Sequence, residues 1–257
     1  MNVKENISAI ILAAGYSSRM GHPKPLLKLG DFTALEHSVR CFLKAGVSDV
    51  RVVTGYRADE VAAAVKSLEV RLVHNPAFDN GMYSSVQAGV RTLEPDVSAF
   101  FVLPVDYPLI KAATVQQLLA RFGFSSGKGV IYPVFNGKRG HPPLISAKLA
   151  DHILNNSFPN GLQGLLSRFE DVAVEVKVAD ESVLMDMDTP EDYRNLLAFL
   201  KGQLVPSTAE CFQILEENQA DELVLDHCRM VARLALALAR RLNMAGAGLD
   251  EDLVVAS

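Results

Sequence analysis

The sequence predicts an α/β protein built on a central, mostly parallel β-sheet. Short, almost continuously apolar runs alternate with amphipathic stretches that have the period of a helix. Strands that are apolar throughout are typical of a parallel sheet covered by helices on both faces. Hydrophobic residues make up 49% of the 257-residue chain, which is enough for one sizeable core, or for a core with a small appendage.

The first half of the chain alternates between strands and helices. The run AIILAAG, residues 9–15, is apolar up to its glycine and predicts the first buried strand. The same criteria predict, in order, a helix at 33–46, a strand at 49–55, a helix at 58–68, a strand at 70–75, a helix at 84–93, a strand at 98–106 and a helix at 112–122. In such sheets ligands bind at the carboxyl ends of the strands, where the loops converge.

The second half is less regular. Residues 129–145 predict strands joined by the polar turn NGKRG, and VAVEVKVA at 172–179 alternates as a half-exposed strand does. Residues 189–200 predict a helix with Thr189 as N-cap and Pro190 in its first turn. The composition changes near Gly202, where we place a domain boundary. We therefore expect a main domain at 1–202 and, at 203–257, a linker with a short all-helical extension containing helices at 209–217 and 221–242.

Composition excludes several classes of protein. The net charge of -5 is spread along the chain, so we expect no nucleic-acid partner. No apolar run is long enough to span a bilayer, and the first residues lack the pattern of a signal peptide, so we expect no membrane partner. The three cysteines, Cys41, Cys211 and Cys228, are far apart and indicate reduced thiols in a cytoplasmic protein.

A glycine-rich loop follows the first predicted strand, in the sequence LAAGYSSRMGHPKPLL. It does not match the pattern G-x-x-x-x-G-K-[ST], because His22 and Pro23 follow Gly21. The pattern G-x-G-x-x-G is also absent after the first strand. Small residues nevertheless let backbone N–H groups approach an anion, and Arg19 and Lys24 add positive charge. Composition alone supports equally well an ordinary turn with solvated basic residues.

A carboxylate stands at the end of a later strand. A loop that binds phosphate groups gathers negative charge, and Mg²⁺ bound by one or two carboxylates together with phosphate oxygens usually neutralises it. Asp106 ends the apolar run AFFVLPVD, where it could face the glycine-rich loop. The alternative is an aspartate that only stabilises a turn, which is common at strand ends.

The order of residues in the loop resembles the nucleotide-binding signature of the nucleoside-triphosphate transferases that act on molybdenum cofactor, most closely the cytidylyltransferase branch. The resemblance covers roughly residues 7–201 and implies a three-layer, Rossmann-like sheet of the nucleotide-diphospho-sugar transferase type. It implies that Arg19 contacts the triphosphate and that Lys24 meets the phosphate under attack. It implies that Ala13, Ala14 and Gly15 hold the base and ribose edge, and that Leu12 and Ser17 also belong to the nucleotide-binding site.

Further segments resemble the same family. LPVDYPLI and MDMDTPEDY imply that Asp106 and Asp188 hold the divalent cation, Mg²⁺, with Asp186 either supporting them or belonging only to the turn. NPAFDNGMYSSVQAGV implies a base contact from Ser85, with Gly81 shaping the nucleotide pocket. Residues of this segment and of GKRGHPPLI are implied on the acceptor side, namely Met82, Ser84, Arg139 and His141. The alternative for His141 is an ordinary surface or hydrogen-bonding residue, and the alternative for Lys138 and Arg139 is that they only solvate a hairpin turn.

The resemblance implies an enzyme that joins CTP to the phosphate of molybdopterin, with a molybdoenzyme as candidate receiver of the product. Three alternatives stay open. The first is the same reaction with GTP, although Ala14 stands where the guanylyl branch usually has glycine. The second is a sugar-1-phosphate nucleotidyltransferase, which the acceptor segments fit less well. The third is a nucleotide-sensing module that regulates an attached HD-type phosphohydrolase domain.

The C-terminal stretch DHCRMVARLALALA lies outside this resemblance and is similar to the opening of an HD-type metal phosphohydrolase domain. His227 corresponds to the first histidine of such a domain, but the His-Asp pair that should follow is absent before Ser257. The stretch as it stands predicts an amphipathic helix that packs on other protein. We expect the natural gene product to be longer than this sequence.

Overall fold

The computed structural model describes residues 6–124, 129–156, 158–204, 211–212, 215, 218–245, 247, 249 and 251–256. The chain divides into two compact units, residues 1–196 and 197–257. Most of the helix expected at 209–217 lies outside the described residues. Within the described part, no helix is long and apolar enough to cross a membrane.

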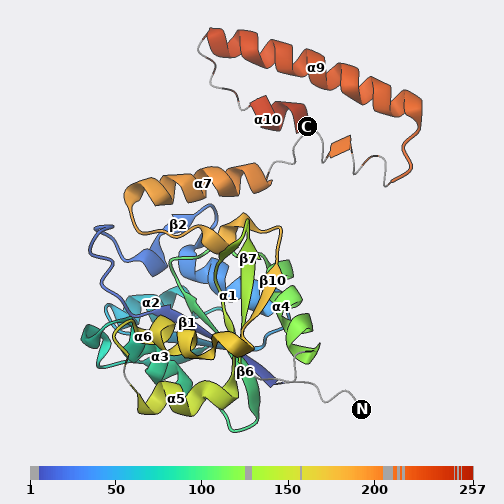
Figure 1. Cartoon of the computed structure of the whole chain (residues 1–257). Coiled ribbons are helices and arrows are strands. Elements are labelled where there is room, and N and C mark those ends of the chain that lie inside the picture. Colours follow the sequence, from blue (N-terminus) through green and yellow to red (C-terminus); the bar gives the residue numbers. More distant parts are fainter. Residues whose placement is uncertain are drawn as a thin grey trace. The chain divides into compact units, whose positions relative to one another are not determined.

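An eight-stranded sheet forms the centre of the first unit (Figure 1). Its strands follow the order β10-β7-β9-β6-β1-β4-β5, with β8 paired to β7. Their bounds are β1 Asn6–Ala13, β4 Asp49–Thr54, β5 Arg71–His74, β6 Val97–Pro104, β7 Val130–Phe135, β8 Lys138–Arg139, β9 Leu144–Ser146 and β10 Val174–Lys177. A separate two-stranded ribbon consists of β2, Lys28–Leu29, and β3, Phe32–Thr33.

The sheet is mostly parallel, as predicted. The pairs β1–β4, β1–β6, β4–β5 and β7–β10 are parallel, whereas β9 runs antiparallel to both β6 and β7. Because β6 and β7 are both antiparallel to β9, they point the same way. The carboxyl ends of β1, β4, β5, β6 and β7 therefore lie at one edge of the sheet.

Helices cover both faces. The helices between residues 34 and 204 are α1 Ala34–Lys44, α2 Ala58–Ala64, α3 Met82–Arg91, α4 Ala112–Phe124, α5 Ala150–Asn155, α6 Gly161–Leu166 and α7 Pro190–Leu204, of which α7 crosses the boundary between the two units. Short 3-10 turns are η1 Lys24–Leu26, η2 Phe78–Asn80, η3 Ala147–Leu149, η4 Ser167–Val172 and η5 Glu181–Leu184. Side chains of a strand alternate between faces. On one face Ile10 and Phe100 pack against residues of α3, α5 and α6, such as Val86. On the other, the ring of Phe101 lies 5.3 Å from that of Phe42 in α1.

Several predicted boundaries shift for local reasons. α3 begins at Met82, two residues before the predicted start, because Gly81 takes the N-cap position with φ 88°. α2 ends at Ala64 rather than at residue 68, and a turn closes it with the Leu68 N–H donating to the Val65 carbonyl. At α7 the predicted cap is present, because the Thr189 hydroxyl accepts from the Asp192 N–H and the Asp192 carboxylate accepts from the Thr189 N–H.

The second unit contains α9, Glu222–Met244, and α10, Glu251–Ala256. α9 matches the helix predicted at 221–242, with Asp221 as its N-cap. Arg240 of α9 forms an ion pair with Glu251 of α10 at 3.1 Å. His227 is exposed on α9. The HD-type resemblance and the domain boundary near Gly202 stay predictions.

Candidate active site

The glycine-rich loop leaves the carboxyl end of β1 and returns at η1. Ser17 and Gly21 both have positive φ, 55° and 67°, which turn the backbone back on itself. The Ser17 carbonyl accepts from the Met20 N–H at 3.0 Å, and the Ser17 hydroxyl oxygen accepts from the Lys24 N–H at 2.9 Å. The loop thus holds Lys24 close to its own start.

Lys24 connects the loop to two carboxylates that are far away in the sequence. Its Nζ lies 3.0 Å from Oδ2 of Asp106, two residues beyond β6, and 2.8 Å from Oδ1 of Asp188, just before α7. Arg19 adds a second cation, with Nη1 2.7 Å from Oδ2 of Asp188. The four charged residues that were predicted to act together therefore lie together, although their roles stay predictions.

Burial sets the charge properties of this cluster. Lys24 is only 8% exposed, and burial alone would lower its pKa, but its bonds to Asp188 and Asp106 outweigh burial and raise it. Burial raises the pKa of Asp106 despite the attraction of Lys24. The hydrogen bond from Lys24, with the charge of Arg19 beside it, lowers the pKa of Asp188. Asp188 is therefore the more firmly ionised of the two carboxylates.

Asp106 and Asp188 could bind a divalent cation whose remaining ligands come from phosphate oxygens and water. Both offer hard oxygen ligands, and both lie within 3.0 Å of the same nitrogen atom. In the described part of the chain no three His, Cys, Asp or Glu side chains form a cluster that could hold a metal. Mg²⁺ usually takes one or two carboxylates together with phosphate oxygens and water, and this donor set fits that pattern.

A cavity of about 300 Å³ adjoins the loop. Arg19 does not line it and has a largely exposed side chain. Every other predicted nucleotide residue does: Leu12, Ala13, Ala14, Gly15, Ser17, Lys24, Gly81, Ser85 and Asp106. Ser85 is buried, and its hydroxyl oxygen accepts a hydrogen bond from the Asn75 amide at 3.0 Å.

Asn75, which sequence reasoning missed, holds Ser85 of this cavity and the neighbouring Ser84 in place. Its amide nitrogen donates to Ser84 Oγ at 2.9 Å and to Ser85 Oγ at 3.0 Å, and its Oδ1 accepts from the Ala77 N–H. The Ser84 hydroxyl donates to the carbonyl of Ala77 or Gly81. Ser84 lines neither of the two cavities described here, so its contacts favour a loop-fixing role over the predicted acceptor contact. The available signal was the asparagine directly after a strand.

Aromatic side chains cover the loop. The ring of Tyr16 lies 5.0 Å from that of Tyr56 and 5.4 Å from that of Phe78, and its hydroxyl donates to Asp79. Tyr16, Phe78 and Asp79 all line the smaller cavity. This aromatic group could not be predicted, because no pattern in the sequence places residue 16 beside residues 56 and 78.

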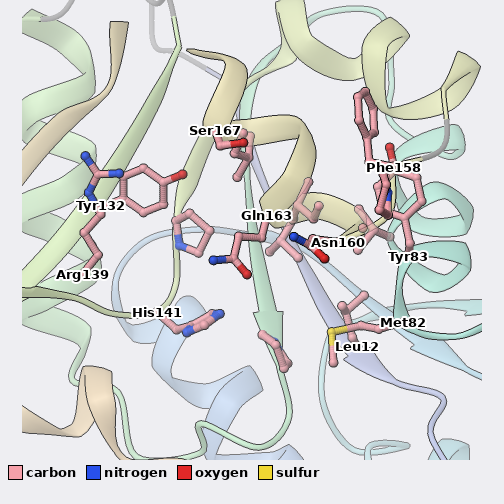
Figure 2. A pocket seen from close by; sticks show the side chains of 18 of the residues that line it. Leu12, Met82, Tyr83, Tyr132, Arg139, His141, Phe158, Asn160, Gln163 and Ser167 are labelled. Carbon is pink, nitrogen blue, oxygen red and sulfur yellow. The ribbon is translucent and has the colours of Figure 1, made fainter. Parts of the chain in front are cut away.

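A second cavity, of about 770 Å³, adjoins the first and shares Leu12, Met82 and Pro104 with it (Figure 2). Arg139 and His141, both predicted to face an acceptor, line it together with Met82. Lys138 is exposed and is not among its lining residues. The larger cavity opens between the carboxyl-end loops and the layer formed by α3 and α6.

Arg139 is already paired. Its guanidinium lies 2.8 Å from Glu170 and 2.7 Å from Glu175, and its Cζ lies 4.6 Å from the centre of the Tyr132 ring. Bonds to the two glutamates raise its pKa further above the ordinary range. Two carboxylates therefore already neutralise the charge of Arg139, which argues against the prediction that Arg139 attracts a phosphorylated acceptor.

The imidazole of His141 is stacked on the Tyr107 ring, with ring centres 4.2 Å apart. The backbone N–H of His141 donates to the Val183 carbonyl at 2.9 Å. Burial lowers the pKa of His141 to about 4, so the imidazole is neutral at pH 7. A neutral ring next to a tyrosine binds by stacking and hydrogen bonding rather than by charge.

Comparison with known proteins gives consistent results. Residues 9–174 match the family described as MobA-like NTP transferase domain. The chain is 29% identical over 188 residues to a molybdenum cofactor cytidylyltransferase of Escherichia coli K12, covering 73% of this chain and 93% of that protein. It is 28% identical over 205 residues to a molybdenum cofactor guanylyltransferase of Rhizobium meliloti, covering 75% and 91%.

Two solved structures share the fold. A nucleotidyl transferase from Methanothermobacter thermautotroptrophicus superposes with a TM-score of 0.67 at 27% identity, covering 77% of this chain and 98% of the other. A Mycobacterium tuberculosis H37Rv protein solved in complex with manganese superposes with a TM-score of 0.63 at 23% identity, covering 76% and 98%. The fold is therefore the Rossmann-like fold of nucleotidyltransferases, as predicted.

Proposed function

Because the chain belongs to the family of MobA-like NTP transferase domains and is a nucleotidyltransferase, we propose that it joins CTP to the terminal phosphate of molybdopterin. A phosphate oxygen of the acceptor attacks the α-phosphorus of CTP. The bond from that phosphorus to the oxygen bridging to the β-phosphate breaks, and pyrophosphate leaves. The product is the cytosine dinucleotide form of the cofactor.

The observation that carries this proposal is the pair of adjoining cavities. The smaller one has the glycine-rich loop, Lys24 and Asp106 in its wall, which suits a nucleoside triphosphate. The larger one has aromatic and polar walls, which suit a second, organic substrate. Because they share Leu12, Met82 and Pro104, groups bound in the two cavities meet at the carboxyl ends of β1 and β6.

Catalysis in this proposal depends on position and charge. Lys24 neutralises charge on the phosphate under attack, the loop amides and Arg19 orient the triphosphate, and no protein nucleophile is needed. Asp106 and Asp188 would hold a divalent cation, Mg²⁺ in the proposal, which supplies charge neutralisation to the phosphates when bound. Support comes from the oxygen donors and from the manganese reported for a protein of the same fold.

The preference for cytosine is a finer part of the proposal. Ala14 is 4% exposed, and its carbonyl accepts from the Tyr56 N–H at 3.1 Å, so it is fixed at the edge of the smaller cavity. The methyl group of Ala14 narrows this edge relative to the glycine usual in the guanylyl branch. Ser85, held by Asn75, would donate its hydroxyl proton to an acceptor atom of the ring.

The test measures pyrophosphate after incubation of the protein with molybdopterin, Mg²⁺ and either CTP or GTP. Release with CTP at least about tenfold faster than with GTP, and lost on addition of EDTA, is expected. Faster release with GTP would favour the guanylyl alternative. Release with glucose 1-phosphate but not with molybdopterin would reject the acceptor.

Three associated expectations also belong to this proposal. They are a cytoplasmic location, delivery of the product to a molybdoenzyme, and an HD-type domain beginning at α9. The retention of both Asp106 and Asp188 at the loop supports an enzyme over a module that only senses nucleotide, since binding alone needs fewer carboxylates beside a triphosphate.

A further inference from the structure

The larger cavity is lined by polar side chains that are available to a ligand: those of Asn160 and Gln163 are exposed, and that of Tyr132 is half-buried. Within the described part of the chain, the structure gives no hydrogen-bond partner to the Tyr132 hydroxyl or to the carboxamides of Asn160 and Gln163. Asn160 precedes α6 at its N-cap position, but its side chain makes no capping bond there. Gln163 lies in the same helix.

These three groups face one space. In Figure 2 the Tyr132 hydroxyl and the carboxamides of Asn160 and Gln163 are directed into the cavity, between His141 on one side and Tyr83 and Phe158 on the other. Burial raises the pKa of Tyr132 to about 12, so its hydroxyl stays protonated and can donate as well as accept. Carboxamides likewise offer both donors and acceptors.

The cavity has almost no free charge. Its lining includes one arginine, Arg139, which is paired with Glu170 of the same lining and with Glu175. The polyanionic end of a substrate would therefore find little electrostatic attraction in this cavity. The other cavity suits it better, because its wall includes Lys24 and the glycine-rich loop.

We propose that Asn160, Gln163 and Tyr132 select the acceptor by hydrogen bonding to the edge of an uncharged, flat heteroaromatic ring system, of the pterin type, that lies in the larger cavity. This inference rests on the proposed function and deepens it. The aromatic side chains of the walls stack on the faces of the ring, and the two carboxamides pair with an edge that alternates donors and acceptors. The phosphate of the acceptor then points toward the smaller cavity.

Arg139 has an indirect part in this arrangement. Because its guanidinium stacks on Tyr132 while it is held by Glu170 and Glu175, it fixes the direction of the Tyr132 hydroxyl. It is a positioning residue and does not bind the acceptor phosphate.

The test uses 6-hydroxymethylpterin, a pterin without phosphate, and measures its binding to the whole chain by the change in the pterin's own fluorescence. Gln163→Leu and Asn160→Leu should each weaken binding about fivefold to tenfold, the loss expected for one or two neutral hydrogen bonds. Affinity for CTP should stay unchanged. Gln116→Leu, at an exposed position of α4, is the matched control and should bind the pterin as the wild type does.

Steady-state kinetics provide a second readout. In the same variants the KM for molybdopterin should rise while kcat and the KM for CTP stay unchanged, because a contact to the ring acts equally in ground state and transition state. A Gln163→Leu/Asn160→Leu double variant with wild-type pterin affinity would overturn the inference, and so would a wild-type protein that does not bind the pterin. A wild-type protein that binds the pterin but releases no pyrophosphate with molybdopterin would instead contradict the proposed function.

Discussion

Lys24 links the glycine-rich loop to the two carboxylates of the site, Asp106 and Asp188, through ion pairs. A buried ammonium between two carboxylates neutralises charges that would otherwise repel each other, and the same ammonium can neutralise a phosphate. Asp106 depends on it most, because burial already disfavours the ionised form of this carboxyl. Only four charged side chains, Arg19, Lys24, Asp106 and Asp188, make up this described cluster, so we expect removal of any one of them to lower the activity strongly.

Replacement of Asp106 tests the proposed metal site. Asp106→Asn keeps the size of the side chain but removes its charge, and kcat should fall about 10²-fold to 10³-fold, the usual effect of losing one electrostatic contact to the reacting group. Pyrophosphate release at saturating substrates measures this. Circular dichroism should show an intact fold, and Asp151→Asn, at an exposed position of α5, serves as control. Near-normal turnover of Asp106→Asn would rule out the assignment.

His141 should make stability depend on pH. Its folded-state pKa of about 4 lies below the ordinary value of 6.5, so between these values the unfolded chain binds more protons than the folded one. The free energy of unfolding is therefore unaffected by this histidine above pH 6.5. It falls by on the order of 3 kcal/mol as the pH drops from 6.5 toward 4.

Urea unfolding at pH 7 and pH 4 checks this expectation. Carboxylates also titrate in this range, so the informative quantity is the difference between wild type and His141→Phe, which retains a ring against Tyr107. The variant should lose less stability on acidification. An equal loss in both proteins would show that burial of His141 does not couple to folding.

Sequence reasoning predicted that the glycine-rich loop faces Asp106 and Asp188, but it did not single out several neutral polar residues near the two cavities. Arg19 and Lys24 stand out because basic residues among glycines and serines are unusual in a loop. Asn160 and Gln163 carry no such signal, since polar residues at the start of a helix are ordinary. Their importance comes from what surrounds them in space, and only the fold brings Asn160 and Gln163 opposite Tyr132.

At the scale of elements, the contact between α3 and β1 depends on a residue without a side chain. A Cβ at Gly89 would lie 2.5 Å from Cγ2 of Ile10, which is buried at the centre of the sheet and cannot retreat. Gly89→Ala should therefore lower the free energy of unfolding by about 1–3 kcal/mol, the usual effect of overpacking a core.

Gly123 in α4 is the matched control. A Cβ there would meet nothing within 4 Å, so Gly123→Ala should be neutral or raise stability by up to about 1 kcal/mol through the better helix propensity of alanine. Thermal unfolding of both variants makes the comparison. Equal shifts for the two would contradict the packing argument.

The order of helices and strands could be predicted because the pattern is local. Apolar strands and amphipathic helices each show their period within a dozen residues, and most predicted elements are present. The direction of β9 could not be predicted in this way. A run of three buried residues after GHPP has no period of its own, and its antiparallel place between β6 and β7 is decided by pairing across the sheet.

At the scale of the whole chain, all residues of the two cavities belong to the first compact unit. A protein ending at Leu204, after α7, should therefore keep CTP affinity and pyrophosphate release within about twofold of the full chain, since one compact unit supplies the lining of both cavities. Titration with CTP and a pyrophosphate assay measure both. A loss greater than tenfold with a folded protein would show that the second unit contributes to the site.

The aromatic composition of the two cavities has a practical consequence for spectroscopy. The chain contains no tryptophan and six tyrosines, so its intrinsic ultraviolet emission comes from tyrosine alone. Tyr16 borders the smaller cavity, and Tyr83 and Tyr132 border the larger one. Half of the emitting side chains thus stand where substrates would enter, and the unlabelled protein carries its own optical probes for both binding events.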